Sequence, residues 1–314
     1  MQAVENIFGG VFRVWDSTGT KLDHSFISFV CFTFRPSAFR FRATRTTHHI
    51  TMSSPNYKFI NKLQGKRILV FGATSGIGFA VTEACIEHGA TVIITGSKAE
   101  RLSTTIQRLQ TSYGDLQSRV TAHVCDLSDE ATLEANIVAL LDAASAHGTH
   151  PLDHISFSAG NALALPPIAA VSIAQLRQLD VVRHLAPVMI AKHAAGRVAA
   201  SPDASFTITG GVNAHKPAPG WAVAAAGGGR NEALVRGLAV DHAPLRVNLV
   251  APGAVDTELL RRLLTPERRE GFVEKTLGKR LGRPEDAAEA YLYLMKDGFV
   301  TGSVIHTNGG ALLV

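Results

Sequence analysis

Cysteine, tyrosine and long apolar runs are all scarce in this chain of 314 residues. The three cysteines, Cys31, Cys85 and Cys125, form neither a metal-binding spacing nor an even set for disulfide bonds. We therefore interpret them as small hydrophobic residues in a reducing compartment, which favours the cytoplasm. No run of about 18 apolar residues is present, so the sequence predicts no membrane span.

Positive charge is concentrated in the first 51 residues. The formal net charge is +5, yet residues 1–51 carry six Lys/Arg against three Asp/Glu, which leaves 25 against 23 for the remaining chain. That remainder is nearly neutral and contains no stripe of Lys and Arg. The composition therefore argues against a nucleic-acid partner.

Residues 1–51 also differ in composition from the rest. No acidic residue lies between His24 and Thr51, and this stretch holds four arginines, a pattern typical of organellar transit peptides. However, Met52-Ser-Ser-Pro resembles a natural start, and the following residues lead directly into the first strand. We expect residues 1–51 to be a disordered extension or a gene-model artefact, and residues 52–314 to be the domain. Organellar targeting through residues 1–51 is the alternative.

From Arg67 onward, short β-branched runs alternate with longer amphipathic stretches. This alternation predicts βαβ units and a parallel sheet. The predicted strands are Ile68–Phe71, Thr91–Thr95, Val120–Cys125, His154–Ser158, Ser205–Thr209, Arg246–Val250 and Ser303–His306. The predicted helices include Gly76–His88, Lys98–Thr111, Glu130–Ala146 and Ser172–His193. The fold class is α/β: one domain with a doubly wound, parallel seven-stranded sheet of the Rossmann type.

Two predicted helices contain residues that weaken helices. Pro187 lies inside the fourth long helix, where it lacks a backbone donor and should kink the chain. Gly227-Gly228-Gly229 lies inside the fifth, where each glycine costs about 1 kcal/mol relative to alanine. Such departures from local rules are expected near functional sites.

A glycine-rich turn follows the first predicted strand and opens the first helix. Its residues are Gly72, Ala73, Thr74, Ser75, Gly76, Ile77 and Gly78. Glycines at this spacing permit a tight turn and let phosphate oxygens approach the N–H groups at the helix start. The position of the turn between strand and helix predicts a dinucleotide-binding site.

The end of the second strand lacks the acidic residue that holds the ribose 2′-hydroxyl of NAD. Ser97, Lys98 and Arg101 stand there instead and could hold a 2′-phosphate, so we predict NADP(H). The alternative is that Lys98 and Arg101 are ordinary solvated residues of a helix start. Asp126, just after the third strand, is predicted to accept from the adenine amino group or to be a simple helix-entry residue.

In these residues the chain resembles the short-chain dehydrogenase/reductase family, over about residues 60–314. The resemblance rests on Gly72–Gly78, Cys125-Asp126-Leu127, the segment Arg246–Thr257 and the C-terminal Thr301-Gly302. It implies that Val255 and Thr257 face the nicotinamide carboxamide. It also implies a small-molecule substrate and a homo-oligomer, a dimer or a tetramer. No metal site is expected.

The polar residues that line the pocket in this family are largely replaced. The family's catalytic Asn, Ser, Tyr and Lys correspond to Val182, Gly211, Ala224 and Gly228, and no tyrosine lies between Tyr113 and Tyr291. Neither alanine nor glycine can donate a proton or lower the pKa of a phenol. The proton donor is therefore unknown.

Six other polar or aromatic residues are expected near the pocket rim, namely Asn161, Arg183, His184, Asn213, His215 and Trp221. We predict that Asn161 and Arg183 contact the cofactor, although Arg183 could simply pack on its helix. His215 is the substitute acid by residue type, against the plainer interpretation of a solvated loop histidine.

Three functions remain open. The first is an NADP(H)-dependent oxidoreductase that acts on a carbonyl or alcohol, with a polyketide or terpenoid intermediate of secondary metabolism as the substrate class. The second is a non-redox isomerase, cyclase or lyase on the same scaffold. The third is a catalytically silent NADP(H)-binding scaffold protein.

Overall fold

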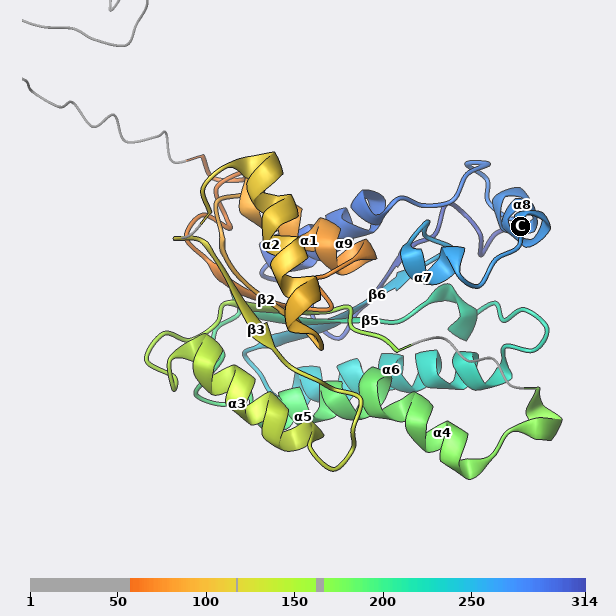
Figure 1. Ribbon diagram of the computed structural model, residues 1–314, viewed down its shortest axis with the longest axis horizontal. Helices are drawn as coiled ribbons and strands as arrows, with labels where there is room; N and C mark the ends of the chain where they lie inside the picture. Colours follow the sequence, from red (N-terminus) through yellow and green to blue (C-terminus); the bar gives the residue numbers. More distant parts are fainter. Residues whose placement is uncertain (1–56, 117, 162–166) are drawn as a thin grey trace, which may run out of the picture. The chain divides into compact units, whose positions relative to one another are not determined.

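Seven parallel strands form a central sheet in the computed structural model, which describes residues 57–116, 118–161 and 167–314 (Figure 1). The strands are β1 (Arg67–Phe71), β2 (Thr91–Gly96), β3 (Val120–Val124), β4 (His154–Phe157), β5 (Ser205–Thr209), β6 (Arg246–Pro252) and β7 (Val304–Thr307). Their order is β3-β2-β1-β4-β5-β6-β7, with every neighbouring pair parallel. Each overlaps a predicted strand, so the doubly wound Rossmann-type sheet is confirmed.

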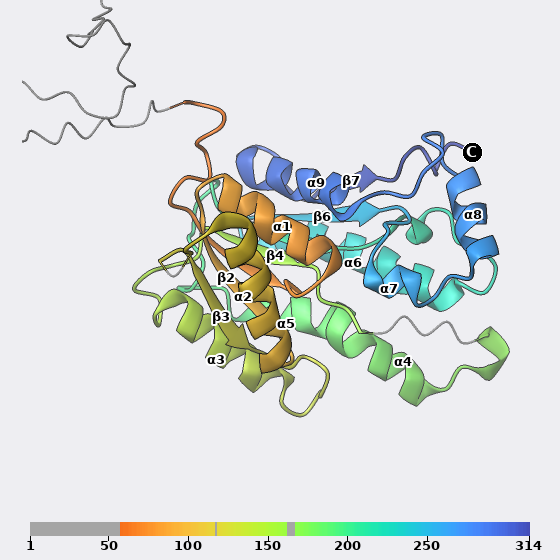
Figure 2. The ribbon, with the colours of Figure 1, turned by 45° about the horizontal axis from the view of Figure 1, so that its top comes forward.

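Helices cover both faces of this sheet. Within the described ranges they are α1 (Gly76–Glu87), α2 (Ala99–Tyr113), α3 (Leu133–Ser145), α4 (Ile173–Asp180), α5 (Ala186–Lys192), α6 (Ala222–Asp241), α7 (Glu258–Arg261), α8 (Pro266–Glu274) and α9 (Pro284–Lys296). Helices α1, α2 and α9 lie on one face and α3, α5 and α6 on the other (Figure 2). None of these helices is long and apolar enough to cross a membrane.

Both faces of the central strands are buried, which is why the strands are almost continuously apolar. Along β1, Ile68 and Val70 join the core under α1 and α9, whereas Leu69 and Phe71 join the core under α3 and α5. The rings of Phe71 and Phe157 lie 5.4 Å apart between centroids and join β1 to β4.

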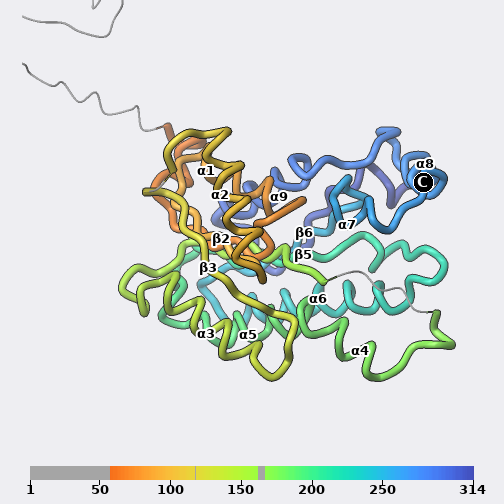
Figure 3. Tube along the Cα trace, viewed as in Figure 1, coloured from red at the N-terminus to blue at the C-terminus, as the bar shows by residue number. Residues whose placement is uncertain are grey.

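The strand order reverses between β1 and β4, because the chain builds β2 and β3 on one side of β1 and β4 to β7 on the other. In sheets of this kind ligands bind where the carboxyl ends of the strands meet such a reversal. The trace in Figure 3 shows α7 and α8 beyond the carboxyl ends of β5 and β6. The predicted site residues therefore gather at one edge of the sheet.

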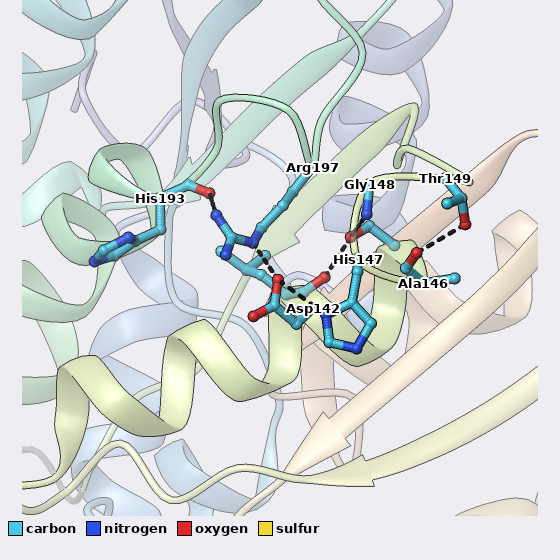
Figure 4. A network of polar contacts seen from close by, with 9 residues as sticks. Asp142, Ala146, His147, Gly148, Thr149, His193 and Arg197 are labelled. Carbon is cyan, nitrogen blue, oxygen red and sulfur yellow. Dashed lines mark hydrogen bonds and ion pairs between the residues drawn. The ribbon is translucent and has the colours of Figure 1, made fainter.

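A polar network lies near the amino ends of the central strands (Figure 4). The Arg197 Nε donates to Asp142 Oδ1 at 2.7 Å, and its Nη1 donates to the carbonyl of His193 at 3.3 Å. These bonds tie the end of α3 to the loop after α5, and the bond from Arg197 holds the pKa of Asp142 below its usual range. This network lies near the amino end of β4, whereas ligands bind at the carboxyl ends of the strands. We therefore assign it a structural role.

Candidate active site

The glycine-rich turn after β1 is too tightly packed for side chains. A β-carbon on Gly78 would lie 2.3 Å from the carbonyl oxygen of Gly72, and one on Gly72 would lie 2.7 Å from the amide nitrogen of Ala159. Gly72 and Gly76 also have φ values of +78° and +53°, which favour glycine. The backbone therefore forms a cradle that a ligand can approach closely.

The start of α1 is left available to an anion. Ser75 occupies the N-cap position, yet among the described residues its side chain makes no capping hydrogen bond. The first N–H groups of a helix then point outward at its positive end, where a diphosphate binds well. Ile77 packs against the core under α1, so it anchors the cradle from below. The cradle fits a dinucleotide.

The end of β2 lies directly beside this cradle. The Thr74 methyl carbon stands 2.8 Å from where a β-carbon on Gly96 would be, so the turn rests on the last residue of β2. Ser97, Lys98 and Arg101 follow and are exposed; Lys98 is the N-cap residue of α2. Neither cation forms an ion pair within the described ranges. The structure therefore gathers two unpaired cations next to the predicted phosphate site.

Asp126 follows β3, as predicted, but its carboxylate already takes part in a turn. Its Oδ1 accepts from the backbone N–H of Ser128 at 2.9 Å and from the hydroxyl at 2.7 Å, which lowers the pKa of Asp126. Its carbonyl accepts from the Asn136 amide at 2.8 Å. Asp126 and Asn136 also line an open hollow of about 420 Å³ between β3 and α3. A contact with adenine stays a prediction.

Asn161 and Arg183, both predicted to contact the cofactor, bind each other. The Arg183 Nε donates to Asn161 Oδ1 at 3.1 Å, and its Nη2 donates to the Asn161 carbonyl at 2.6 Å. The guanidinium lies over Gly160, whose β-carbon would be 2.8 Å from Nη2. Burial lowers the pKa of Arg183. Since it has no carboxylate partner within the described chain, Arg183 is a half-buried positive charge beside the loop that covers Gly72.

A π-helical turn, η2 (Val181–Leu185), separates α4 from α5. The helix predicted over Ser172–His193 is thus divided, with Pro187 in the first turn of α5, and the kink at this proline stays a prediction. Because Pro187 has no N–H, the Arg183 carbonyl lacks its helical donor, and the Asn231 amide of α6 donates to it instead at 2.8 Å. The other end of that amide pairs with His184 Nδ1 at 2.8 Å. Asn231 is not among the residues that the sequence singles out, because its contact with η2 depends on how α6 packs.

The four positions of the missing catalytic residues hold no group that can move a proton. Val182 is buried in the π-helical turn, and Gly211 follows β5. Ala224 lies in the first turn of α6, which continues through Gly227, Gly228 and Gly229 without a break. The small size of Gly228 admits the turn η3 (Val212–Ala214): a β-carbon on Gly228 would lie 3.1 Å from that of Ala214. Gly228 therefore serves close packing, whereas a β-carbon on Gly227 or Gly229 would meet nothing within 4 Å among the described residues.

His215 is held by a carboxylate that the sequence analysis did not single out. Its Nε2 lies 2.8 Å from Oε1 of Glu232, a buried residue of α6. Its ring also meets His306 of β7 edge to face, with 4.8 Å between centroids. The sheet order places β7 three strands away from β4. His215 thus contacts the outermost strand, β7, on this side of the sheet. Its role as a substitute acid stays a prediction.

The segment after β6 reaches back to the cradle. Val255 is buried and pairs with Gly282 through an isolated bridge. The Thr257 hydroxyl accepts from the Leu260 N–H at 3.3 Å and so caps α7. The Thr257 methyl lies 2.9 Å from where a β-carbon on Gly76 would be. The predicted nicotinamide segment and diphosphate turn therefore meet. Trp221, expected near the pocket rim, is the N-cap residue of α6.

Comparison with known proteins identifies this arrangement. The model of the SDR-like Rossmann domain matches residues 59–314. The short-chain dehydrogenase/reductase malC of Malbranchea aurantiaca is 41% identical over 264 residues, covering 83% of this chain and 99% of that protein. The short-chain dehydrogenase/reductase fsr5 of Gibberella fujikuroi is 35% identical over 266 residues, covering 82% and 98%.

A solved structure gives the same answer. That of the MalC Reductase/Diels-Alderase from Malbranchea aurantiaca superposes with a TM-score of 0.77 at 41% identity, covering 81% of this chain and 99% of that one. The sequence resemblance is therefore confirmed over nearly the whole length of these relatives. The chain belongs to the short-chain dehydrogenase/reductase family of oxidoreductases, whose Rossmann domain binds a nicotinamide cofactor.

Proposed function

We propose that this protein is an NADP(H)-dependent oxidoreductase that acts on a carbonyl or alcohol without the family's tyrosine and lysine. The approach of Thr257 to Gly76 carries the proposal, because it joins the nicotinamide segment to the diphosphate cradle. A chain that had lost its cofactor would have no need for a cradle in which Gly72 and Gly78 exclude every side chain.

The choice of NADP(H) over NAD(H) rests on charge. Lys98 and Arg101 stand exposed beside the cradle, without ion-pair partners in the described ranges, at the place where a 2′-phosphate would lie. Guanidinium and ammonium groups bind phosphate strongly, and none of the three residues directly after β2 is an acid that could accept from a 2′-hydroxyl. Glu100, in the first turn of α2, is the nearest acid in the sequence.

A nicotinamide cofactor held by the cradle would supply hydride chemistry, in which negative charge develops on the oxygen of a carbonyl substrate. Arg183 holds a positive charge at this edge of the sheet, bound to Asn161 and lacking a carboxylate partner in the described chain. A preorganised charge of this kind stabilises an oxyanion without donating its own proton. The alkoxide takes its proton from water or from a group of the substrate. We therefore assign Arg183 to charge stabilisation as well as to cofactor binding.

A second function is favoured by one specific observation. The relative with 41% identity is described as a Reductase/Diels-Alderase. A cycloaddition forms two carbon–carbon bonds and transfers no proton, so Val182, Gly211, Ala224 and Gly228 would be no handicap for it. The scaffold would then act by holding its substrate in a reactive conformation.

Further proposals complete this assignment. We expect the substrate to be a polyketide or terpenoid intermediate of secondary metabolism, and the protein to be a cytoplasmic homo-oligomer, a dimer or a tetramer. Residues 1–51 lie outside the described residues. We propose that they form an extension to the domain at 52–314, because fully buried core residues begin only at Leu63 within the described part.

One experiment distinguishes these functions. Purified protein is mixed with NADPH or NADH and a panel of ketones, imines and dienes, and both the absorbance at 340 nm and the product mass are followed. Loss of absorbance with a gain of two hydrogens in the product supports the oxidoreductase. Conversion at constant absorbance and constant mass supports the cycloaddition. Cofactor binding without any conversion across the panel supports the silent scaffold.

A further inference from the structure

The side chain of Asn213 occupies space that Gly211 leaves open. A β-carbon on Gly211 would lie 2.5 Å from Oδ1 of Asn213, closer than real β-carbons approach any atom. The backbone of Gly211 does not itself require glycine, because its φ of 179° and ψ of 151° are extended values open to any residue. A side chain at position 211 would therefore have to displace the amide of Asn213 from this space.

This amide lies at the same edge of the sheet as the nicotinamide segment. The β-carbon position of Gly211 is 3.9 Å from the carbonyl oxygen of Pro252, the last residue of β6. Strands β5 and β6 run in parallel register up to the pair Thr209 and Val250. Gly211 therefore follows β5 where the chain after β6 turns toward Val255 and Thr257.

The turn that carries Asn213 is fixed. In η3 the Ala214 N–H donates to the Gly211 carbonyl at 3.2 Å, and the His215 N–H donates to the Val212 carbonyl at 3.0 Å. Ala214 packs against Gly228 of α6 from the other side. The backbone that carries the Asn213 side chain is therefore held in place, which lowers the entropy cost of binding a ligand there.

The neighbouring polar side chains satisfy one another, but Asn213 does not join them. Asn161 binds Arg183, Asn231 binds the Arg183 carbonyl and His184, and His215 binds Glu232. Across the described ranges the half-buried amide of Asn213 has no hydrogen-bond partner in the protein. A free amide held at an active-site edge is suited to a ligand, because a site with such a group rejects molecules that cannot bond to it.

We propose that the Asn213 amide binds the carbonyl oxygen of the substrate and orients it for hydride transfer. This proposal rests on the proposed oxidoreductase function and names the chemical class, a ketone or aldehyde with an accessible oxygen. As hydride adds to the carbonyl carbon, the π electrons move to the oxygen, and the N–H of the amide donates to the resulting alkoxide. Water then gives the alkoxide its proton and leaves hydroxide to the buffer. The amide keeps its own protons throughout.

The proposal is tested first by a measurement that needs no turnover. The full chain is saturated with NADP⁺ and titrated with cyclohexanone labelled with ¹³C at the carbonyl, and the carbonyl carbon shift is followed by NMR. Wild type and Val212→Ala, a change in the same turn, should move the signal downfield, as hydrogen bonding to the oxygen does. Asn213→Ala should abolish this shift. The proposal is overturned if wild type shows no NADP⁺-dependent shift, or if Asn213→Ala retains it.

The second arm measures reduction of ketones by NADPH at 340 nm. Asn213→Ala should lower kcat/KM by a factor of about 10²–10³, the usual effect of removing one donor to an oxyanion, with NADPH affinity within twofold of wild type. Gly211→Ser added to Asn213→Ala offers a hydroxyl in the vacated space and should recover part of the loss. A fall of less than threefold overturns the role of Asn213 while the redox function stands. If wild type shows the NMR shift but never oxidises NADPH, the redox function fails while Asn213 remains a ligand-binding residue.

Discussion

The carboxylate of Glu258 lies beside the start of α1: its Oε2 is 3.7 Å from the position of a β-carbon on Gly76. The N–H groups at this helix start are those expected to receive the diphosphate of the cofactor. An acid at this position interacts favourably with the helix dipole when no phosphate is present and repels a phosphate that arrives. We therefore expect the Glu258 carboxylate to compete with the cofactor diphosphate for the positive end of α1.

We expect Glu258→Gln to tighten NADPH binding by about threefold, in line with the energies of exposed charge pairs. The gain should shrink as salt is raised, because screening weakens interactions between exposed charges. Fluorescence titration at two salt concentrations measures both effects. Glu267→Gln on α8 is the matched control and should leave affinity unchanged. Equal or weaker binding by Glu258→Gln would show that this carboxylate does not face the cofactor.

We expect a preference for NADP(H) that depends on Arg101 and Lys98. We expect at least a tenfold tighter binding of NADPH than of NADH, and Arg101→Ala should weaken NADPH binding by about 1–2 kcal/mol while hardly affecting NADH. The matched control is Arg108→Ala on the same helix, where the guanidinium stacks on Phe79 at 3.9 Å from the ring centroid. Calorimetric titration with both cofactors checks the prediction, and equal affinities for them in wild type would contradict it.

His154 makes the stability of the fold depend on pH. Burial, the main cause, lowers the pKa of His154 to about 3, with smaller contributions from Arg246 and Lys66 and an opposing one from Asp153. The unfolded chain binds a proton near pH 6.5, whereas the folded chain does not until about pH 3. The contribution of His154 to stability is therefore intact above pH 6.5 and declines by about 1.4 kcal/mol per pH unit as the pH falls toward 3.

Denaturant unfolding at pH 7 and pH 5.5 measures this effect. In the folded protein the His154 Nδ1 pairs with the Ser205 hydroxyl at 2.9 Å, and glutamine can form a similar bond. His154→Gln should thus retain the fold and lose part of the pH dependence, whereas His150→Gln, at an exposed position, should keep it. An unchanged slope in His154→Gln would mean that other groups control acid unfolding.

The sheet could be predicted well from the sequence because each strand is a short run with β-branched residues that can be recognised from local sequence alone. The runs in β1 and β2 are apolar on both faces, and the glycine turn stands directly between β1 and α1, where a dinucleotide-binding turn is expected. The sequence could not show that the Asn213 side chain occupies the space beside Gly211, because this contact depends on the three-dimensional position of the side chain. The pairing of His215 with Glu232 likewise depends on how η3 packs against α6.

The continuity of α6 also shows where local rules fail. Three consecutive glycines predict a weak helix, yet α6 extends from Ala222 to Asp241. The approach of Ala214 to Gly228 and the bonds of Asn231 to η2 supply tertiary contacts that override the propensity. Most helical stability in proteins comes from such packing, which the sequence does not display.

His215 is bound to a buried carboxylate, and we expect this structural contact to outweigh any role as a general acid. We expect His215→Ala to lower kcat/KM by less than threefold, since its ring contacts His306 on β7, whereas general acids typically contribute about a hundredfold or more. The same change removes the partner of the buried Glu232 carboxylate and should reduce stability by about 1–3 kcal/mol. Steady-state kinetics and denaturant unfolding separate the two effects. A hundredfold loss of activity at unchanged stability would establish His215 as the proton donor.

Restoring the family's tyrosine and lysine should not restore its chemistry. Lysine at position 228 would drive its β-carbon to within 3.1 Å of that of Ala214 and displace η3, which also carries Asn213. We expect Ala224→Tyr with Gly228→Lys to reduce stability by about 1–3 kcal/mol, the usual cost of overpacking, and to give little or no gain in NADPH-dependent ketone reduction. Ala224→Tyr alone is the control, because it tests the phenol without disturbing Ala214. The wild-type pH–rate profile should also lack the alkaline limb of a lysine-activated tyrosine. If the double variant instead gains general ketoreductase activity, the pocket has kept the ordinary geometry of the family, and the wild-type chain is a silenced homologue.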